Sequence, residues 1–384
     1  MKISTATRLE SVKEYYFSKK LREVAALIKA GKPVLNMGIG SPDLPPHPSV
    51  VEALHGAMGH PRANMYQSYQ GLPELREAIA HFYDCHYAVT LNPSSEILPL
   101  MGSKEGIMHI SMAFLNKGDK VLIPNPAYPT YSAVTQLVEA SPVFYNLSNA
   151  NNWQPDFKAL EALDTSKIKL MWLNYPHMPT GAKAQRATFE RLIAWAKKEE
   201  ILLINDNPYS FILNDHPQSI LSLPGAKDVA MELNSLSKSF NMAGWRVGML
   251  SGTAKNIQAV LKVKSNMDSG MFYGIQQGAI AALNTPSSWF HELNKVYKRR
   301  RVLVEELANL MDTTFDPNSV GMFVWAKLND PSVPAEKYID QILYEKDIFI
   351  TPGTIFGSQG EGYIRFSLCV NEDQIRTAIN RMKA

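Results

Sequence analysis

A lysine lies among small hydroxyl residues in the segment 235–248, which reads SLSKSFNMAGWRVG. Because an apolar, strand-like run precedes it, we expect Lys238 near a strand end, partly enclosed. An enclosed lysine has a lowered pKa and can form an imine with an aldehyde. Eight residues later Arg246 supplies a permanent cation, which suits a phosphate dianion together with the hydroxyls of Ser235 and Ser237. Taken alone, Lys238 is better explained as an ordinary surface lysine, and Arg246 as a structural arginine.

An aspartate follows the apolar run 201–204 directly, in the segment NDNPY (205–209). The carboxyl end of a strand is where open α/β sheets bind ligands. There Asp206 can keep a pyridine nitrogen protonated, which makes the ring an electron sink. Tyr209 can donate a hydrogen bond to a phenolate oxygen on the same ring. By itself, Asp206 is explained equally well as the cap of a turn before a proline.

Two further segments are weaker signals. The segment GSKEG (102–106) places small residues at the start of a helix, where free backbone N–H groups and the helix dipole attract anions. It matches neither the Walker pattern nor the dinucleotide fingerprint. The segment PAYPTY (126–131) places Tyr128 after a strand-like run, where its ring can stack on a flat cofactor. A helix cap and an ordinary packed ring explain these two segments nearly as well.

The elements that must position these residues alternate from residue 73 to residue 283. A helical pattern spans 73–87, with a proline in its first turn. Compact apolar runs separated by helical patterns indicate a parallel sheet covered on both faces; they lie at 97–101, 121–123, 143–145, 170–173 and 201–204.

The chain divides into three predicted segments. Residues 45–285 form a large cofactor-binding domain of the α/β class, and residues 286–384 form a smaller α+β domain. Residues 1–44 form an N-terminal arm, whose helix (about 11–30) cannot bury its apolar face alone and is expected to pack on the small domain.

Composition and charge exclude several classes of protein. The 384 residues carry 39 basic and 36 acidic side chains, a balance too even to indicate nucleic-acid binding. Three arginines at 299–301, in a helical stretch, predict a solvated helix face. Cys85 and Cys369 are far apart, so we expect neither a disulfide framework nor a metal site. No signal-peptide or membrane-spanning run is present, and we expect a cytoplasmic protein.

Taken together, these segments occur in order, each at a strand-to-helix junction. Over nearly its whole length the sequence resembles the fold-type-I, class I/II aminotransferases, which use pyridoxal 5'-phosphate. The resemblance implies a mostly parallel, seven-stranded sheet plus a smaller domain. It assigns the Schiff-base lysine to Lys238, the pyridine partner to Asp206 and a phenolate donor to Tyr209. The other cofactor-binding residues that it implies are Ser103, Lys104, Tyr128, Asn174, Ser235, Ser237 and Arg246.

The same resemblance assigns residues to the substrate and to a second subunit. Gly40, in the segment GSPD (40–43), matches a glycine turn whose backbone approaches the substrate carboxylate. Arg365, in YIRFS (363–367), matches the arginine that binds this carboxylate in a bidentate manner. Tyr66 matches a tyrosine that reaches the cofactor phosphate of the neighbouring subunit. A homodimer with active sites at the subunit interface is therefore expected.

One position departs from the family's pattern. The family usually has Asn-Pro-Thr-Gly here, and its asparagine donates a hydrogen bond to the cofactor's phenolate oxygen. This chain has Met178 before Pro179, and a thioether cannot donate a hydrogen bond. Tyr209 is then the expected protein donor to the phenolate, unless Asn174, His177 or a water molecule substitutes.

The predicted reaction is transfer of an amino group between an L-amino acid and a 2-oxo acid in a ping-pong scheme. The same scaffold also supports carbon–sulfur β-lyases, which would release ammonia and pyruvate, and fold alone does not separate the two. A non-catalytic binding or regulatory relative is the third interpretation. Which amino acid and which oxo acid are preferred cannot be read from the sequence.

Overall fold

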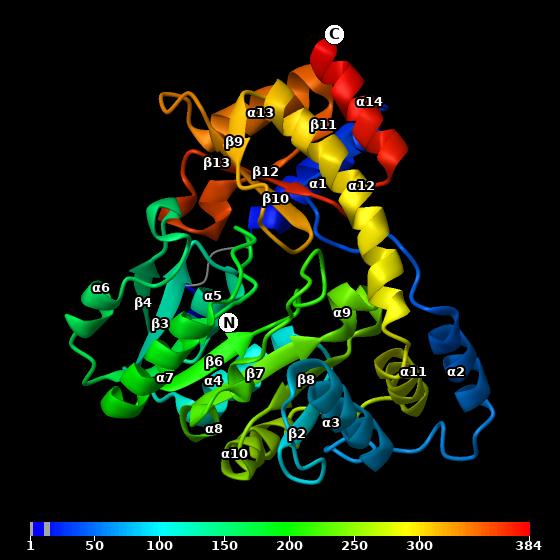
Figure 1. The fold of residues 1–384 in the computed structure, drawn as a ribbon, viewed down its shortest axis with the longest axis vertical. Coiled ribbons are helices and arrows are strands. Elements are labelled where there is room, and N and C mark those ends of the chain that lie inside the picture. Colours follow the sequence, from blue (N-terminus) through cyan, green and yellow to red (C-terminus); the bar gives the residue numbers. More distant parts are fainter. Residues whose placement is uncertain (1–2, 11–15) are drawn as a thin grey trace.

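The computed structural model describes residues 3–10 and 16–384. Its largest sheet has seven strands in the order β2-β8-β7-β6-β5-β3-β4 (Figure 1). All neighbouring strands are parallel except that β8 is antiparallel to both β2 and β7. The predicted mostly parallel sheet is confirmed. The strands are β2 (Ile97–Leu100), β3 (Lys120–Asn125), β4 (Ser141–Asn146), β5 (Ile168–Leu173), β6 (Leu202–Asp206), β7 (Ala230–Ser235) and β8 (Gly248–Ser251).

Helices cover both faces of this sheet, which explains why its strands are apolar without interruption. In β5, Leu170 and Trp172 pack with α4 (Ser103–Phe114), α5 (Thr130–Leu137) and α10 (Ala254–Lys264). The alternate residues Met171 and Leu173 belong to the core that includes α3 (Pro73–Tyr87) and α7 (Arg186–Glu199). The predicted helix at 73–87 is confirmed. The other helices of this part are α2 (Pro48–Met58), α6 (Phe157–Glu161), α8 (Ala226–Val229), α9 (Leu236–Ser239) and α11 (Tyr273–Leu283).

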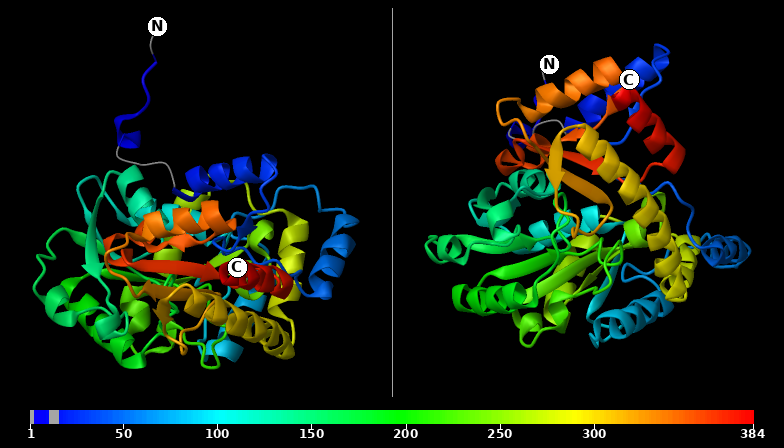
Figure 2. Two further views of the ribbon diagram at one scale, coloured as in Figure 1. Left: turned by 90° about the horizontal axis from the view of Figure 1, so that it is seen from above. Right: turned by 45° about the horizontal axis from the view of Figure 1, so that its top comes forward.

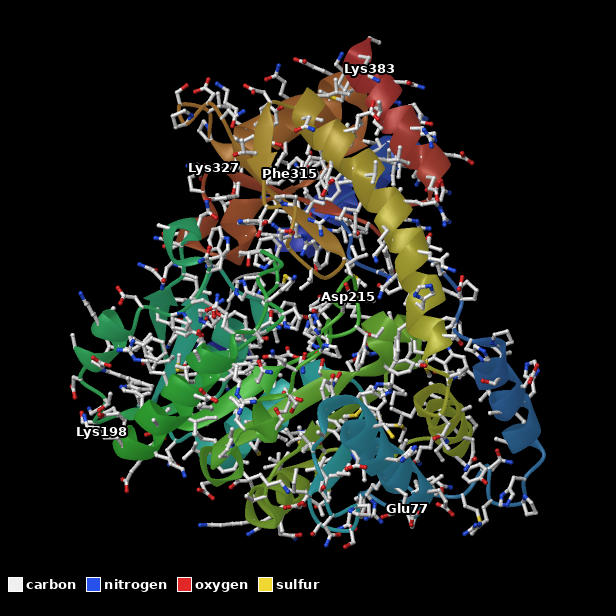
Figure 3. The ribbon with its side chains drawn as sticks, viewed as in Figure 1. Glu77, Lys198, Asp215, Phe315, Lys327 and Lys383 are labelled. Carbon is white, nitrogen blue, oxygen red and sulfur yellow. The ribbon has the colours of Figure 1, made fainter. Side chains whose placement is uncertain are left out.

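A second, antiparallel sheet lies in the C-terminal part of the chain and has the order β12-β13-β10-β9. The helices packed around it are drawn above the large sheet in Figure 1, and Figure 3 adds the side chains to the same view. The elements are α12 (Ser288–Leu310), β9 (Thr313–Phe315), β10 (Phe323–Leu328), α13 (Ala335–Lys346), β12 (Thr351–Pro352), β13 (Tyr363–Ser367) and α14 (Glu372–Lys383).

The N-terminal segment joins this C-terminal unit, as predicted. β1 (Leu35–Asn36) pairs in parallel with β11 (Ile348–Phe349). α1 (Tyr16–Lys29) buries Val24 against Leu343 and Phe349. The first five residues of the predicted helix, 11–15, lie outside the described part of the chain.

Residues 3–10 extend from the rest of the molecule (Figure 2), and all of their side chains are exposed. No described helix combines the length and the apolar character needed to cross a membrane.

The predicted solvated face at residues 299–301 is wrong for two of the three arginines. Arg299 is exposed and pairs with Glu372, but Arg300 and Arg301 on α12 are buried. Arg300 donates to both carboxylate oxygens of Asp43, at 2.7 Å each, and Arg301 donates to Ser319. The sequence does not reveal that this face of α12 packs against the rest of the chain, where acceptors satisfy the two guanidinium groups.

Candidate active site

The strand directions explain why the candidate residues meet at one edge of the large sheet. β5, β6 and β7 are parallel, so their carboxyl ends share that edge, and Asp206 and Ser235 are the last residues of β6 and β7. Because β8 runs in the opposite direction, its beginning lies at the same edge, and Arg246 precedes it by two residues. The ends of β6 and β7 therefore supply a carboxylate and a hydroxyl to this edge, and the segment before β8 supplies a cation.

A cavity of about 560 Å³ lies at this edge and extends to β13. Every predicted site residue lines it except Tyr66, namely Gly40, Ser103, Lys104, Tyr128, Asn174, Asp206, Tyr209, Ser235, Ser237, Lys238, Arg246 and Arg365. The cavity thus brings together residues from both sheets and from the segment after β1.

Lys238 lies on the short helix α9, directly after β7. Its Nζ donates a hydrogen bond to the backbone oxygen of Gly40 at 2.5 Å, which aims the amine into the cavity. Burial lowers the pKa of Lys238; the nearby Cys369 acts in the opposite direction, and the cations Arg365 and Arg246 lower the pKa further. The net effect disfavours the ammonium form, so the structure favours a nucleophilic amine at this position.

The two oxygens of Asp206 have different environments. Oδ2 accepts a hydrogen bond of 2.7 Å from the Tyr131 hydroxyl, whereas the buried Oδ1 has no hydrogen-bond partner among the described residues. Burial raises the pKa of Asp206 to about 6, and the bond from Tyr131 acts in the opposite direction. A buried carboxylate oxygen without a donor is costly, and it fits a cationic N–H group of a ligand.

Sequence reasoning missed Tyr131. Its ring stacks on Trp172 at a centroid distance of 4.8 Å, and this contact holds the hydroxyl against Asp206. The available signal was its position three residues after Tyr128, in the first turn of α5.

Opposite Asp206, the first turn of α4 and the loop before β8 form an anion cradle. Gly102 has φ 91°, and a Cβ there would lie 2.0 Å from Arg246 Nη2. A Cβ on Gly248 would lie 2.6 Å from the backbone nitrogen of Ser103. Glycine at both positions lets the guanidinium, the helix N-terminus and the Ser235 hydroxyl approach one anion together.

Arg365 enters the cavity from β13 and is held on several sides. Its Nη2 donates to Gly38 O at 2.8 Å, and its Cζ lies 3.9 Å from the ring centroid of Phe323 and 4.7 Å from that of Phe356. The two rings fix the plane of the guanidinium, which is the geometry needed for bidentate carboxylate binding. The contacts of these two rings with Arg365 were not predicted, because they form only when the C-terminal part of the chain packs together.

Tyr66 lies outside the cavity, and its side chain is 90% exposed. Met65 and Tyr69 on the same loop are exposed as well. Within one chain the structure therefore gives Tyr66 no contact with the site.

The site and fold define a class of enzyme, and comparison with known proteins agrees. Residues 32–382 match the family model described as aminotransferase class I and II. The chain belongs to this family and is an aminotransferase.

The individual relatives resemble the chain over its full length. It is 41% identical to an LL-diaminopimelate aminotransferase of Dehalococcoides mccartyi, covering 100% of this chain and 98% of the relative. It is 36% identical to the enzyme of that name from Nitratidesulfovibrio vulgaris, covering 98% of each. Among solved structures, apo-BacF from Bacillus subtilis matches with a TM-score of 0.95 and 35% identity, covering 100% of this chain and 98% of that one.

Proposed function

We propose that this aminotransferase uses pyridoxal 5'-phosphate and holds it through Lys238. The observation that carries the proposal is that one cavity presents three groups that match three parts of this cofactor. A lysine with a lowered pKa suits its aldehyde, the unpartnered Oδ1 of Asp206 suits its ring nitrogen, and the cradle at Arg246 suits its phosphate. Tyr128, which lines the same cavity, supplies a ring to stack on the pyridine.

When bound, the cofactor supplies an electron-withdrawing ring that accepts the charge left when the amino acid loses its α-proton. The chain's own residues then have separate tasks. Asp206 keeps the ring nitrogen protonated, and Arg365 orients the substrate through its carboxylate. Lys238, once released from the cofactor, moves the proton from the substrate α-carbon as a general base. Tyr209 stays protonated because burial raises its pKa, and it donates to the ring oxygen.

We infer that the amino donor is LL-diaminopimelate or a closely related amino acid and that the acceptor is a 2-oxo acid. The support is the name shared by relatives that are 36–41% identical over the full chain. 2-Oxoglutarate is the acceptor to test first, because Arg365 is positioned to bind the α-carboxylate of such an acid as well.

The assay that tests this function follows both possible products of the same incubation. The holoenzyme is given LL-diaminopimelate with and without 2-oxoglutarate, and glutamate and ammonia are both measured. Glutamate that forms only when both substrates are present supports the proposal. A parallel incubation contains a sulfur-containing amino acid such as cystathionine and no oxo acid. Ammonia released in that incubation would instead identify the β-lyase alternative.

We also propose that the active form is a homodimer. The exposed Tyr66, the exposed segment 3–10 and the exposed Met267 support it, because all three are available to a second copy of the chain. A cytoplasmic location, without membrane or nucleic-acid partners, stays a prediction.

A further inference from the structure

Met178 lines the cavity together with Tyr209 and Asn174. Asn174 bonds to the backbone of both Asp206 and Met178, so Met178 lies near the carboxylate that suits the ring nitrogen. In pyridoxal phosphate the ring carbon that carries the aldehyde lies between the carbons that carry the hydroxyl and the phosphate arm. If Lys238 held the aldehyde, Asp206 the ring nitrogen and Arg246 the phosphate, the hydroxyl would lie on the side away from the cradle, and Tyr209 and Met178 would be the candidates to meet it.

The amide of Asn174 is held in place by two hydrogen bonds, which use one of its two N–H hydrogens. Its Nδ2 donates to the backbone oxygen of Asp206 at 2.6 Å, and its Oδ1 accepts from the backbone nitrogen of Met178 at 2.9 Å. Both ends of the amide thus tie the segment at 178 to the end of β6. Turning the amide toward the cavity would break both bonds in a buried site.

His177 does not substitute either. It is 2% exposed, does not line the cavity, and its Nδ1 is 2.8 Å from Thr180 Oγ1. Burial lowers the pKa of His177 to about 3, so the ring carries no charge at neutral pH.

Met178 itself is directed toward Arg365. Its Sδ accepts a hydrogen bond from Arg365 Nη1 at 3.4 Å, and the side chain is 6% exposed. A thioether has lone pairs but no hydrogen to donate.

We propose that Met178, which has no hydrogen to donate, leaves Tyr209 as the main side-chain donor to the ring oxygen. The Lys238–cofactor linkage consequently keeps its proton to a higher pH than it would with a donor at position 178. This inference rests on the proposed function and deepens it.

The direction follows from where the negative charge is stabilised. While the linkage nitrogen is protonated, its proton is shared with the adjacent ring oxygen. After the proton leaves, donors from the protein alone stabilise the anionic oxygen, so each donor favours deprotonation. One added charge-assisted hydrogen bond corresponds to a shift of about one pH unit.

Other charged and titratable groups near Lys238 also affect the absolute value. They come from several packed elements and are Asp206, Tyr209, Arg246, Arg365, Cys369 and Tyr128. Substitution at position 178 keeps all six side chains. Both Met178→Asn and Met178→Leu remove the thioether that Arg365 Nη1 contacts, so the difference between these two variants reports on the added donor.

The experiment is a pH titration of the visible absorption band of the holoenzyme, which measures the linkage and not turnover. Met178→Asn is compared with the natural protein and with Met178→Leu, a matched change that supplies no donor. The apparent pKa is expected to fall by about one unit in Met178→Asn and to stay within about 0.3 unit in Met178→Leu. In Tyr209→Phe, which removes the main donor, it should rise.

Equal titrations of Met178→Asn and Met178→Leu would overturn the inference, as would an unchanged titration of Tyr209→Phe. Met178→Gln provides a second donor variant if the asparagine variant does not fold. Borohydride reduction of the natural holoenzyme, followed by peptide mass analysis, separates this inference from the proposed function. If Lys238 carries the reduced cofactor but the apparent pKa does not differ between the variants, only the inference about Met178 is wrong. If Lys238 carries no reduced cofactor, the proposed function is wrong.

Discussion

Asp206 shows how much a single residue depends on one neighbour. Its Oδ2 is fixed by Tyr131, its Oδ1 is left for a ligand, and burial raises its pKa to about 6. A carboxyl group with a raised pKa is charged above that pH and neutral below it. The empty site therefore offers a charged carboxylate to a protonated ring nitrogen above about pH 6, and the affinity for the cofactor falls as the pH drops below that value.

We predict that Tyr131→Phe shifts this loss to higher pH. Without the Tyr131 hydroxyl the charged form of Asp206 loses a stabilising hydrogen bond, so its pKa rises, by about one unit. The measurement is the cofactor affinity of the apoprotein from pH 5 to pH 8. Tyr145→Phe is the control, because it removes another buried hydroxyl, which bonds to the backbone of Trp172 and not to Asp206. Identical pH profiles for the two variants would contradict the account.

The residues predicted from sequence share one property. Asp206 ends β6, Lys238 follows the end of β7, and Arg246 precedes the start of β8. The strand pattern of the sequence is therefore enough to place all three at one edge of the sheet. Tyr131, Phe323 and Phe356 act through contacts between elements far apart in the chain, which no local pattern reveals. Tyr66 stays a prediction, because its assigned role concerns a second subunit.

At the scale of elements, α12 illustrates where pattern reading fails. Its arginines predicted an exposed face, yet Arg300 is buried and tied to Asp43 in the segment that contains Gly40. A charged helix residue is normally solvated, and only the packing of α12 against the segment after β1 shows otherwise.

We predict that Arg300→Met destabilises the fold by about 1–2 kcal/mol, because it removes two charge-assisted hydrogen bonds to Asp43, whose side chain is 32% exposed. Arg299→Met is the matched control on the same helix, because the Arg299–Glu372 pair is exposed and is expected to contribute less than about 1 kcal/mol. Unfolding in urea, followed by circular dichroism, measures both. Similar midpoints for the two variants would show that the Arg300 pair has no special importance.

A second buried cluster links two elements near the cradle. Glu105 and His109 on α4 form a bond of 2.6 Å, and Asp268, whose carboxylate lies close to both, binds Lys264 of α10 at 2.8 Å. The ammonium of Lys264 balances one of the two carboxylates, both of which belong to half-buried residues, and this pair ties the loop after α10 to α10, beside the helix that begins the anion cradle.

At the scale of the whole molecule, the cavity joins both sheets, but one predicted residue stays outside it. The division into 1–44, 45–285 and 286–384 remains a prediction. The segment 3–10 and the loop that carries Tyr66 expose apolar side chains, including Ile3 and Met65. We propose that a second copy of the chain covers them and that Tyr66 then reaches the anion cradle of that copy.

We predict that Tyr66→Phe weakens cofactor binding by about tenfold, because a charge-assisted hydrogen bond to the phosphate is lost. Tyr69→Phe, at another exposed tyrosine of the same loop, is the control. Equilibrium titration gives the affinities, and light scattering gives the mass of the active form. An active monomer, or equal affinities for the two variants, would contradict the dimer.

The central claim is that Lys238 binds pyridoxal phosphate and that the site transfers amino groups. The measurement that tests it most directly is the visible absorption spectrum of the purified protein with added cofactor, before and after LL-diaminopimelate and then 2-oxoglutarate, with Lys238→Ala as control. The account predicts a band of the lysine-linked cofactor that bleaches with the amino acid and returns with the oxo acid. It also predicts that Lys238→Ala shows no such cycle. A natural protein that gains no band, or a Lys238→Ala variant that completes the same cycle, would contradict the account.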